Sequence, residues 1–168
     1  MTFWRLYYHL IWATKDREPL IQPEMEGRLY GYTIRKAAEL GVYVYVANGW
    51  FDHMHVIVAI PPKLAVADVV KHLKGSSSHD INHEMTLEYQ FQWQRGYGAL
   101  SIGEKHRLAA IEYVLKQKEH HQQQTTNARL ERSDELDEGP SDVGIVLDAV
   151  PMVKERQTAY DALGEPPF

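Results

Sequence analysis

Residues 42–60, VYVYVANGWFDHMHVIVAI, contain two apolar runs separated by a short polar turn. Runs of this length that are rich in valine and tyrosine are typical of strands, and a turn containing glycine and aspartate is typical of a hairpin. The stretch therefore predicts two antiparallel strands, 42–50 and 53–60, joined tightly at Gly49–Asp52. This hairpin decides the fold class, because the sequence predicts a strand and a helix before it and a helix and a strand after it.

On the N-terminal side of the hairpin, residues 3–14, FWRLYYHLIWAT, are aromatic and branched and predict another strand. Pro23 then begins a helical stretch to about Leu40, and Gly41 is placed to end it. The chain thus enters the hairpin from a strand followed by a helix.

On the C-terminal side, Pro61 and Pro62 end the second strand of the hairpin. The apolar positions Val66, Val69, Val70 and Leu73 have helical spacing and predict a helix that ends at the breaker 75–78. Residues 91–102, FQWQRGYGALSI, contain a fourth strand. Ser101 and Glu104 have the spacing of a capping box, so a last helix is expected through roughly His121.

The order strand, helix, strand, strand, helix, strand is that of a ferredoxin-like (RRM-like) α+β sandwich. We therefore expect a four-stranded antiparallel sheet with two helices on one face. The last helix has to pack elsewhere, and the uncovered face of the sheet is the available surface.

The composition fits one domain followed by a tail. The chain has 168 residues, 44% of them hydrophobic, no cysteine, and no apolar run that approaches a membrane span. Residues 1–124 carry 14 Lys and Arg against 13 Asp and Glu, whereas 125–168 carry 4 against 10. We expect one folded domain over 1–124 and an acidic tail over 125–168 that is disordered or weakly helical. The tail is either an inert extension or an acidic brake on the domain that precedes it.

Two histidines lie on one face of the strand 53–60. Side chains alternate along a strand, so His53 and His55 point to one face while Met54 and Val56 point to the more apolar, opposite face. The apolar face is expected to lie against the two helices, which leaves both imidazoles on the other face near its rim. A His-x-His pattern by itself has a high false-positive risk, since buried histidines in a sheet give the same pattern.

The last predicted helix supplies partners for these histidines. Its apolar residues Leu108, Ile111, Val114 and Leu115 form one stripe, and Tyr113 and Gln117 stand one turn apart on nearly the opposite side. Docking of this helix on the histidine face would bring two imidazoles and an amide oxygen to a phenol. The bland alternative is that Tyr113 is exposed or packs as an ordinary aromatic.

Such a set of nitrogen and oxygen ligands suits an octahedral divalent ion that keeps positions open for water or phosphate. Imidazoles alone would favour zinc or iron, whereas the amide and a phosphate oxygen favour Mg²⁺ or Mn²⁺. The chemistry expected is phosphoryl transfer, in which the Tyr113 oxygen attacks a phosphate and forms a covalent phosphotyrosine.

With these residues in place, the sequence resembles the single-tyrosine HUH transposases of the insertion-sequence 200/605 group. The similarity covers about residues 6–121 and includes LYYHLIWATKDREPLI, DHMHVIVAIPP, VADVVKHLKGSSS, FQWQRGYGALSIG and the pair Tyr113 and Gln117. The resemblance implies that His53, His55 and Gln117 bind the metal and that Tyr113 becomes linked to a 5′ phosphate. It also implies single-stranded DNA with imperfect hairpins as substrate, and homodimers whose active sites are shared between subunits.

Weaker candidates surround this set. Lys71, Lys74, Ser76, Arg95 and Tyr97 are candidates for DNA contact, with solvated helix faces and sheet packing as the alternatives. Asp52 is a candidate to orient an imidazole by a hydrogen bond, or is simply a turn aspartate. The resemblance and the absence of a secretory leader imply a bacterial cytoplasmic protein that associates with the nucleoid when it acts.

Two other functions remain open at this point. One is a domesticated relative that binds hairpins or single strands without cutting them. The other is a small metal hydrolase that uses His53 and His55 with an activated water and does not need Tyr113.

Overall fold

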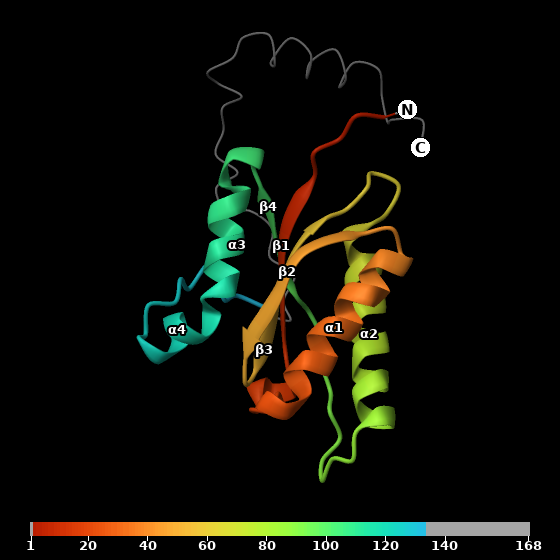
Figure 1. Ribbon diagram of the computed structural model, residues 1–168, viewed down its shortest axis with the longest axis vertical. Coiled ribbons are helices and arrows are strands. Elements are labelled where there is room, and N and C mark those ends of the chain that lie inside the picture. Colours follow the sequence, from red (N-terminus) through yellow and green to blue (C-terminus); the bar gives the residue numbers. More distant parts are fainter. Residues whose placement is uncertain (1, 134–168) are drawn as a thin grey trace, which may run out of the picture. The chain divides into compact units, whose positions relative to one another are not determined.

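The computed structural model describes residues 2–133, which form a four-stranded antiparallel sheet with helices on both faces (Figure 1). The strands are β1 (Tyr7–Ala13), β2 (Tyr43–Trp50), β3 (His53–Ala59) and β4 (Gly98–Ile102), in the spatial order β2-β3-β1-β4. The helices are α1 (Pro23–Glu39), α2 (Val66–Glu84), α3 (Arg107–Leu115) and α4 (Gln117–Gln122). The predicted ferredoxin-like sandwich is confirmed. Of the predicted tail, residues 134–168 lie outside the described residues.

One face of the sheet packs against α1 and α2, which lie together on one side of it (Figure 1). Alternate residues of the two central strands point into this layer, as the strand period requires. The fully buried core includes Leu10 and Trp12 from β1, Met54, Val56 and Val58 from β3, Met25 and Leu29 from α1, and Val70 and Leu73 from α2. The apolar face predicted for β3 is therefore the core face.

The other face of the sheet is covered by α3, whose Val114 packs against Val46 and Ile57. His53 and His55 lie on this face and are 1% and 0% exposed, so they are buried and not at an open rim. The helix that carries Tyr113 thus docks where the sequence placed it. Leu108 and Leu115 do not belong to its packing stripe, since they are 74% and 61% exposed.

Helix α2 continues through the predicted breaker at residues 75–78 and ends at Glu84. The reason is that the serine hydroxyls donate to carbonyl oxygens of the preceding turn, Ser76 to His72 and Ser78 to Lys74. Ser77 is fully buried and accepts a hydrogen bond from Trp93 Nε1 at 3.0 Å. Serines whose hydroxyl groups donate hydrogen bonds within the helix do not end it.

The last predicted helix is divided into α3 and α4 at Lys116, whose backbone has φ −93° and ψ 15°. The side chain of Asn48 on β2 donates to the carbonyl oxygens of Val114 and Leu115, at 2.9 and 3.1 Å, and so satisfies the end of α3. The predicted capping box is wrong: Ser101 pairs with Tyr8 within the sheet, and the N-cap residue of α3, His106, makes no side-chain capping hydrogen bond.

The fourth strand is shorter than the predicted stretch 91–102, because β4 begins at Gly98. Before it, Trp93 makes an isolated bridge with Thr14, and Lys74 donates to the carbonyl oxygens of Gln94 and Gly96 at 2.7 and 2.6 Å. Residues 94–97 therefore form a turn held by α2.

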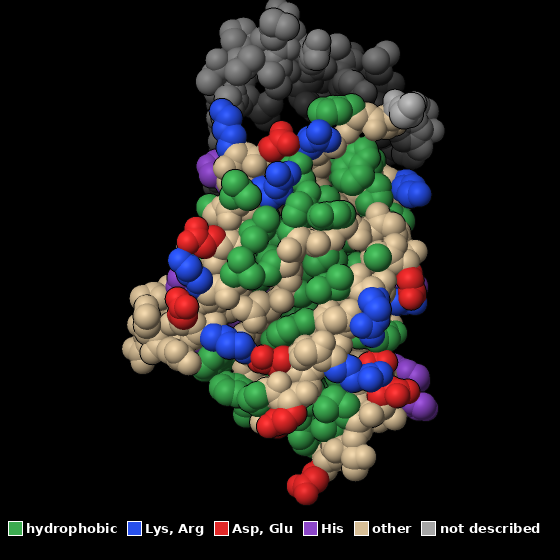
Figure 2. Space-filling view, viewed as in Figure 1, with side chains coloured by type: hydrophobic (Ala, Val, Ile, Leu, Met, Phe, Trp, Pro, Cys, Tyr) green, Lys and Arg blue, Asp and Glu red, His purple; other side chains and the backbone are tan. Residues whose placement is uncertain are grey.

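On the face seen in Figure 2, acidic and basic side chains lie around a central region of hydrophobic side chains and form no continuous basic stripe. Among residues 2–133, no helix has the length and apolar character needed to cross a membrane.

Candidate active site

Two histidines of β3 are held by hydrogen bonds to their Nδ1 atoms. His55 Nδ1 lies 2.7 Å from Nε2 of His9, which stands on β1 and is itself buried. His53 Nδ1 lies 2.6 Å from Oδ1 of Asp52, whose Oδ2 accepts from Arg17 at 3.1 Å. With both Nδ1 atoms engaged, both Nε2 atoms face the site, where His53 Nε2 also lies 3.2 Å from Nε2 of His121. The contact predicted for Asp52 is present; the contact of His9 was not predicted.

Tyr113 lies near the end of α3, and Gln117 begins α4. The ring centroids of Tyr113 and His55 are 6.3 Å apart, so the phenol and the imidazoles of the same chain share one site. Gln117 is fully buried, and among the described residues its Oε1 has no hydrogen-bond partner. The structure thus brings together the four residues predicted to form the site: His53, His55, Tyr113 and Gln117.

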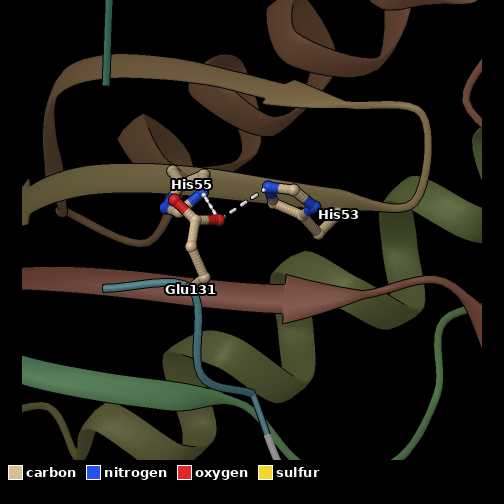
Figure 3. Close-up of side chains that lie close together, drawn as sticks. All are labelled: His53, His55 and Glu131. Carbon is tan, nitrogen blue, oxygen red and sulfur yellow. Dashed lines mark hydrogen bonds and ion pairs between the residues drawn. The ribbon is translucent and has the colours of Figure 1, made fainter. Parts of the chain in front are cut away.

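A carboxylate that was not predicted stands between these four residues. Oε2 of Glu131 lies 3.0 Å from His53 Nε2 and 3.1 Å from His55 Nε2 (Figure 3). Its Oε1 accepts a hydrogen bond from the Tyr113 hydroxyl at 2.5 Å and another from Gln117 Nε2 at 3.1 Å. Glu131 lies within the segment assigned to the tail, and nothing in the sequence distinguishes it from the other nine acidic residues there.

Residues 127–133, called the 127–133 segment from here on, are fixed across the site by further contacts. The Asn127 amide donates to the Tyr113 hydroxyl at 3.1 Å, Arg17 donates to the Glu131 carbonyl oxygen at 3.0 Å, and Gln94 donates to the Ser133 carbonyl oxygen at 3.0 Å. The segment passes so close to β4 that a Cβ added to Gly98 would lie 2.2 Å from the Arg132 carbonyl oxygen. Only glycine permits this approach.

The charge states follow from burial and from the carboxylates. Burial lowers the pKa of His55 to about 4 and that of His9 to about 3, so both rings are neutral at pH 7. Burial also tends to lower the pKa of His53, but its hydrogen bonds to Asp52 and Glu131 outweigh burial and raise it. Burial tends to raise the pKa of Glu131, but its hydrogen bonds with the two imidazoles outweigh this and hold its pKa well below the usual range.

The phenol of Tyr113 is protonated at pH 7. Burial raises its pKa to about 12, and the neighbouring Glu131 carboxylate adds to the rise, although the Asn127 amide opposes it. The hydroxyl is therefore a donor to the carboxylate, and a neutral phenol of this kind is a weak nucleophile.

The donor atoms fit a divalent ion. His53, His55 and Glu131 each offer one ligand atom, and these atoms lie within 4.8 Å of one another. The separations of Glu131 Oε2 from the two Nε2 atoms, 3.0 and 3.1 Å, match the edge of about 3 Å between neighbouring ligands of an ion bound at about 2.1–2.2 Å. The unsatisfied Oε1 of Gln117 is a further oxygen donor. Nitrogen and oxygen donors without thiolates are compatible with Mg²⁺, Mn²⁺ or zinc.

The five residues predicted to contact DNA lie apart from this cluster, on α2 and on the turn at residues 94–97 that precedes β4. Lys71 and Arg95 are exposed, and Ser76 and Tyr97 are partly buried. Lys74 is partly buried against the 94–96 turn. Gln94 of that turn contacts the 127–133 segment, so the turn and the histidine face are joined through it.

Comparison with protein families gives a match to the family model described as "Transposase IS200 like", over residues 2–117. A transposase for insertion sequence element IS200 from Salmonella typhimurium is 31% identical over 124 residues, covering 70% of this chain and 80% of the relative. The ISDra2 transposase TnpA of Deinococcus radiodurans is 29% identical over 119 residues, covering 68% of this chain and 85% of the relative.

Solved structures agree with the fold. A crystal structure from Deinococcus radiodurans, described as a candidate transposase, has a TM-score of 0.57 and 26% identity, and covers 69% of this chain and 93% of that one. A REP-associated tyrosine transposase bound to a REP hairpin has a TM-score of 0.55 and 13% identity, and covers 86% of this chain and 99% of that one. At that identity, the second likeness concerns the fold alone.

Proposed function

The chain belongs to the family of IS200-like transposases, and we propose that it cleaves and rejoins single-stranded DNA at hairpin-marked ends of a mobile element. Tyr113 is the nucleophile and carries a 5′ phosphate between the two steps. His53, His55 and Gln117 hold a divalent ion, Mg²⁺ or Mn²⁺, at which Glu131 competes with the DNA. These assignments give residues of this chain the roles that membership of the family implies.

One observation supports the proposal above the others: the four residues converge on a single anionic group. The Glu131 carboxylate contacts both imidazoles, the phenol and the Gln117 amide at once. A phosphodiester is also an anion with two non-bridging oxygens. A site that binds a carboxylate in this way has the shape and the donors to bind a scissile phosphate in the same place, with the Tyr113 oxygen beside it.

In the cleavage step the Tyr113 oxygen forms a bond to phosphorus and the bond from phosphorus to the 3′ oxygen breaks. The phenol proton is lost to solvent, and the released 3′ oxygen takes up a proton. Rejoining reverses the step, with a 3′ hydroxyl attacking the phosphotyrosine. A bound divalent ion would neutralise charge on the phosphate and lower the pKa of a nearby phenol. His9 and Asp52 keep the two Nε2 atoms directed at the site.

Glu131 has to leave before DNA can be cleaved, because its carboxylate occupies the position proposed for the phosphate. In this role the 127–133 segment is a tethered competitor of the substrate, and its contacts with Arg17 and Gln94 set how firmly it is held. The brake that the sequence suggested for the whole tail is thus proposed to be a single carboxylate, that of Glu131.

DNA outside the cleavage site is proposed to run along α2 and the turn that follows it. Lys71 and Arg95 present exposed cations, and Ser76 and Tyr97 lie beside them on the same elements. Lys74 contributes by holding the 94–96 turn in place. A few phosphate contacts of this kind give binding that weakens as salt is added.

The protein is further proposed to act as a homodimer with shared active sites. In the described chain, Tyr113 contacts the site of its own chain through Glu131; exchange of α3 between two chains would build the same site twice. A mixture of Tyr113→Phe and His55→Ala proteins tests this. Shared sites restore cleavage in the mixture, whereas sites formed within one chain leave both variants inactive.

The decisive experiment for the proposed function is detection of the covalent intermediate. A hairpin oligonucleotide with single-stranded flanks and a 3′ label, incubated with Mn²⁺, is expected to yield an adduct that survives denaturing electrophoresis. Tyr113→Phe should abolish it, and the matched control Tyr32→Phe on α1, on the opposite side of the sheet, should not. An adduct that persists in Tyr113→Phe would refute the assignment. Hairpin binding without any adduct would instead support the non-catalytic binding module.

A further inference from the structure

A hollow of about 670 Å³, separate from the active site, lies at the other end of the strands from the histidines. It is formed by the N-terminal segment, the start of β1 and β2, the end of β3 and the start of α3. Its lining includes Phe3, Arg5, Tyr7, Tyr43, Tyr45 and Arg107. Figure 2 shows hydrophobic side chains next to Lys or Arg side chains at this end of the described chain.

Two aromatic rings of the hollow, Phe3 and Tyr43, lie outside the core, whereas Tyr7 is buried and belongs to it. Phe3 is 82% exposed and Tyr43 is 62% exposed, whereas large apolar side chains in this fold are otherwise mostly buried. Tyr45 links the cluster, with its ring centroid 4.7 Å from that of Tyr43 and 6.0 Å from that of Tyr7. Exposed aromatic faces of this kind are the surfaces on which bases stack.

Two arginines stand among these rings. The Arg107 guanidinium lies 4.8 Å from the ring centroid of Tyr7 and 5.1 Å from that of Tyr45, and it donates to the Tyr7 hydroxyl at 2.8 Å. Its Nε is buried and has no hydrogen-bond partner among the described residues. A buried donor without an acceptor is costly, and an anionic ligand would satisfy it.

The second arginine, Arg5, lies over the Phe3 ring at 4.5 Å and donates to Glu104 Oε1 at 3.2 Å. The same carboxylate oxygen accepts from the Tyr7 hydroxyl at 3.3 Å. Among the described residues that line the hollow, one carboxylate stands against two guanidinium groups, so this lining has a net positive charge. That charge suits a ligand that combines a flat ring with a single anionic group.

The hollow and the active site share one face of the sheet. His55, Ile57 and Ala59 alternate with the core residues of β3, and Ala59 lines the hollow. Ala59 lies four positions after His55 along the strand, a distance of roughly 13 Å. A single strand of nucleic acid whose phosphate lies at Tyr113 can therefore reach the hollow within a few nucleotides.

We propose that this hollow binds an unpaired nucleotide of the single strand that flanks the cleavage position. The base stacks on Tyr43 and Phe3, and its phosphate accepts from Arg107. The inference rests on the proposed function for its choice of single-stranded DNA, but it concerns a site separate from the metal and the nucleophile. The hollow would set where along the strand the scissile phosphate comes to lie.

The test uses the full chain with Tyr113→Phe in every protein, so that binding is measured without cleavage. The added variants are Tyr43→Ala and Phe3→Ala, both at exposed positions, and the control is Ile34→Ala, which is 41% exposed on α1. The probes are a blunt hairpin, the same hairpin with single-stranded flanks, and an unstructured single strand. A 2-aminopurine base is placed at each flank position in turn, because stacking quenches its fluorescence.

Each aromatic substitution is expected to weaken binding of both single-stranded probes by roughly 5- to 100-fold. The two aromatic variants should bind the blunt hairpin as the parent does. The control Ile34→Ala should bind every probe as the parent does. One flank position should be quenched, and Tyr43→Ala should release that quenching. If the aromatic variants bind flanked and blunt hairpins like the parent, the hollow is not a nucleotide site, and the proposed function is unaffected. If the parent binds no single strand at all, both proposals fail.

Discussion

The hydroxyl of Tyr113 and the carboxylate of Glu131 are joined by a hydrogen bond of 2.5 Å. The other oxygen of that carboxylate lies between two buried imidazoles, so one acidic side chain bridges the proposed metal ligands and the proposed nucleophile. This places an internal anion at the position where the proposed chemistry requires a phosphate.

Removal of that anion is expected to activate the enzyme. Glu131→Ala should form the covalent adduct faster by about tenfold, which corresponds to a competitor worth about 1.4 kcal/mol. Glu119→Ala, at an exposed position on α4, removes the same charge without opening the site and should leave the rate unchanged. Single-turnover kinetics measure both. A slower reaction in Glu131→Ala would instead identify Glu131 as a required ligand or base.

The phenol should titrate at lower pH once Glu131 is removed. Burial raises the pKa of Tyr113 to about 12 in the intact chain, and the carboxylate adds to that rise. Loss of the negative charge favours the phenolate, so the pKa should fall toward its ordinary value near 10. Carbon-13 labelling of the tyrosine Cζ and titration by NMR give the pKa of Tyr113, assigned with Tyr113→Phe. An equal or higher value in Glu131→Ala would contradict this account.

The metal-free protein should lose stability as the pH falls below about 6.5. The pKa values of His9 and His55 are lowered to about 3 and 4, so the unfolded chain binds protons in this range that the folded chain does not. Each of these two histidines costs about 1.4 kcal/mol per pH unit. His53, whose pKa is raised, acts in the opposite direction, but its contribution changes only above pH 6.5. His121, whose pKa is lowered, adds to the loss below that pH. Urea denaturation with chelator at pH 7 and pH 4.5 measures the difference.

A matched variant makes that pH test specific. His9→Gln removes one of the groups responsible, so its stability should depend less steeply on pH between 6.5 and 4. A dependence identical to that of the unchanged chain would mean that other groups cause the acid sensitivity.

Loss of the orienting carboxylate should weaken metal binding. In Asp52→Asn, His53 loses the acceptor that fixes its ring, and the affinity for Mn²⁺ is expected to fall by about 10- to 100-fold. Asp68→Asn, at an exposed position on α2, is the control with the same change of charge. Isothermal titration calorimetry compares the two; equal affinities would remove Asp52 from the site.

Asn48 should matter for both stability and rate, because its amide holds the last carbonyl groups of α3. Asn48→Ala is expected to cost about 1–3 kcal/mol of unfolding free energy, since two hydrogen bonds are lost, and to slow adduct formation by misplacing Tyr113. Gln122→Ala, exposed on α4, serves as the control. Unchanged stability in Asn48→Ala would show that α3 ends at Leu115 without this cap.

The sheet and its two-faced alternation could be predicted from the sequence because strand period and hairpin turns are local signals. The docking of the helix with Tyr113 followed from the same pattern. The break at Lys116 could not be predicted, since it depends on Asn48, which lies far away in the chain. The continuation of α2 through residues 75–78 was missed because serines end some helices and are satisfied within others, and only the surrounding contacts decide.

His9 illustrates a signal that was present but unused. It shares one face of the predicted first strand with Tyr7 and Ile11. Pairing of that strand with β3 places this face on the same side of the sheet as the two histidines. Glu131 gave no comparable signal. One carboxylate among many in an acidic stretch has no period or motif, so only the three-dimensional structure distinguishes it.

Strand β1 lies in the middle of the sheet, between β3 and β4, although it is the first strand of the chain. Its partners are about 45 and about 90 residues away, and pairings of such long range are slow to form. During synthesis, the edge of β1 that β4 will cover stays open until residues 98–102 have emerged. A chain stopped before Gly98 therefore exposes an unpaired strand edge, which is prone to aggregation. Both edges of β1 can therefore be paired only after translation has passed residue 102.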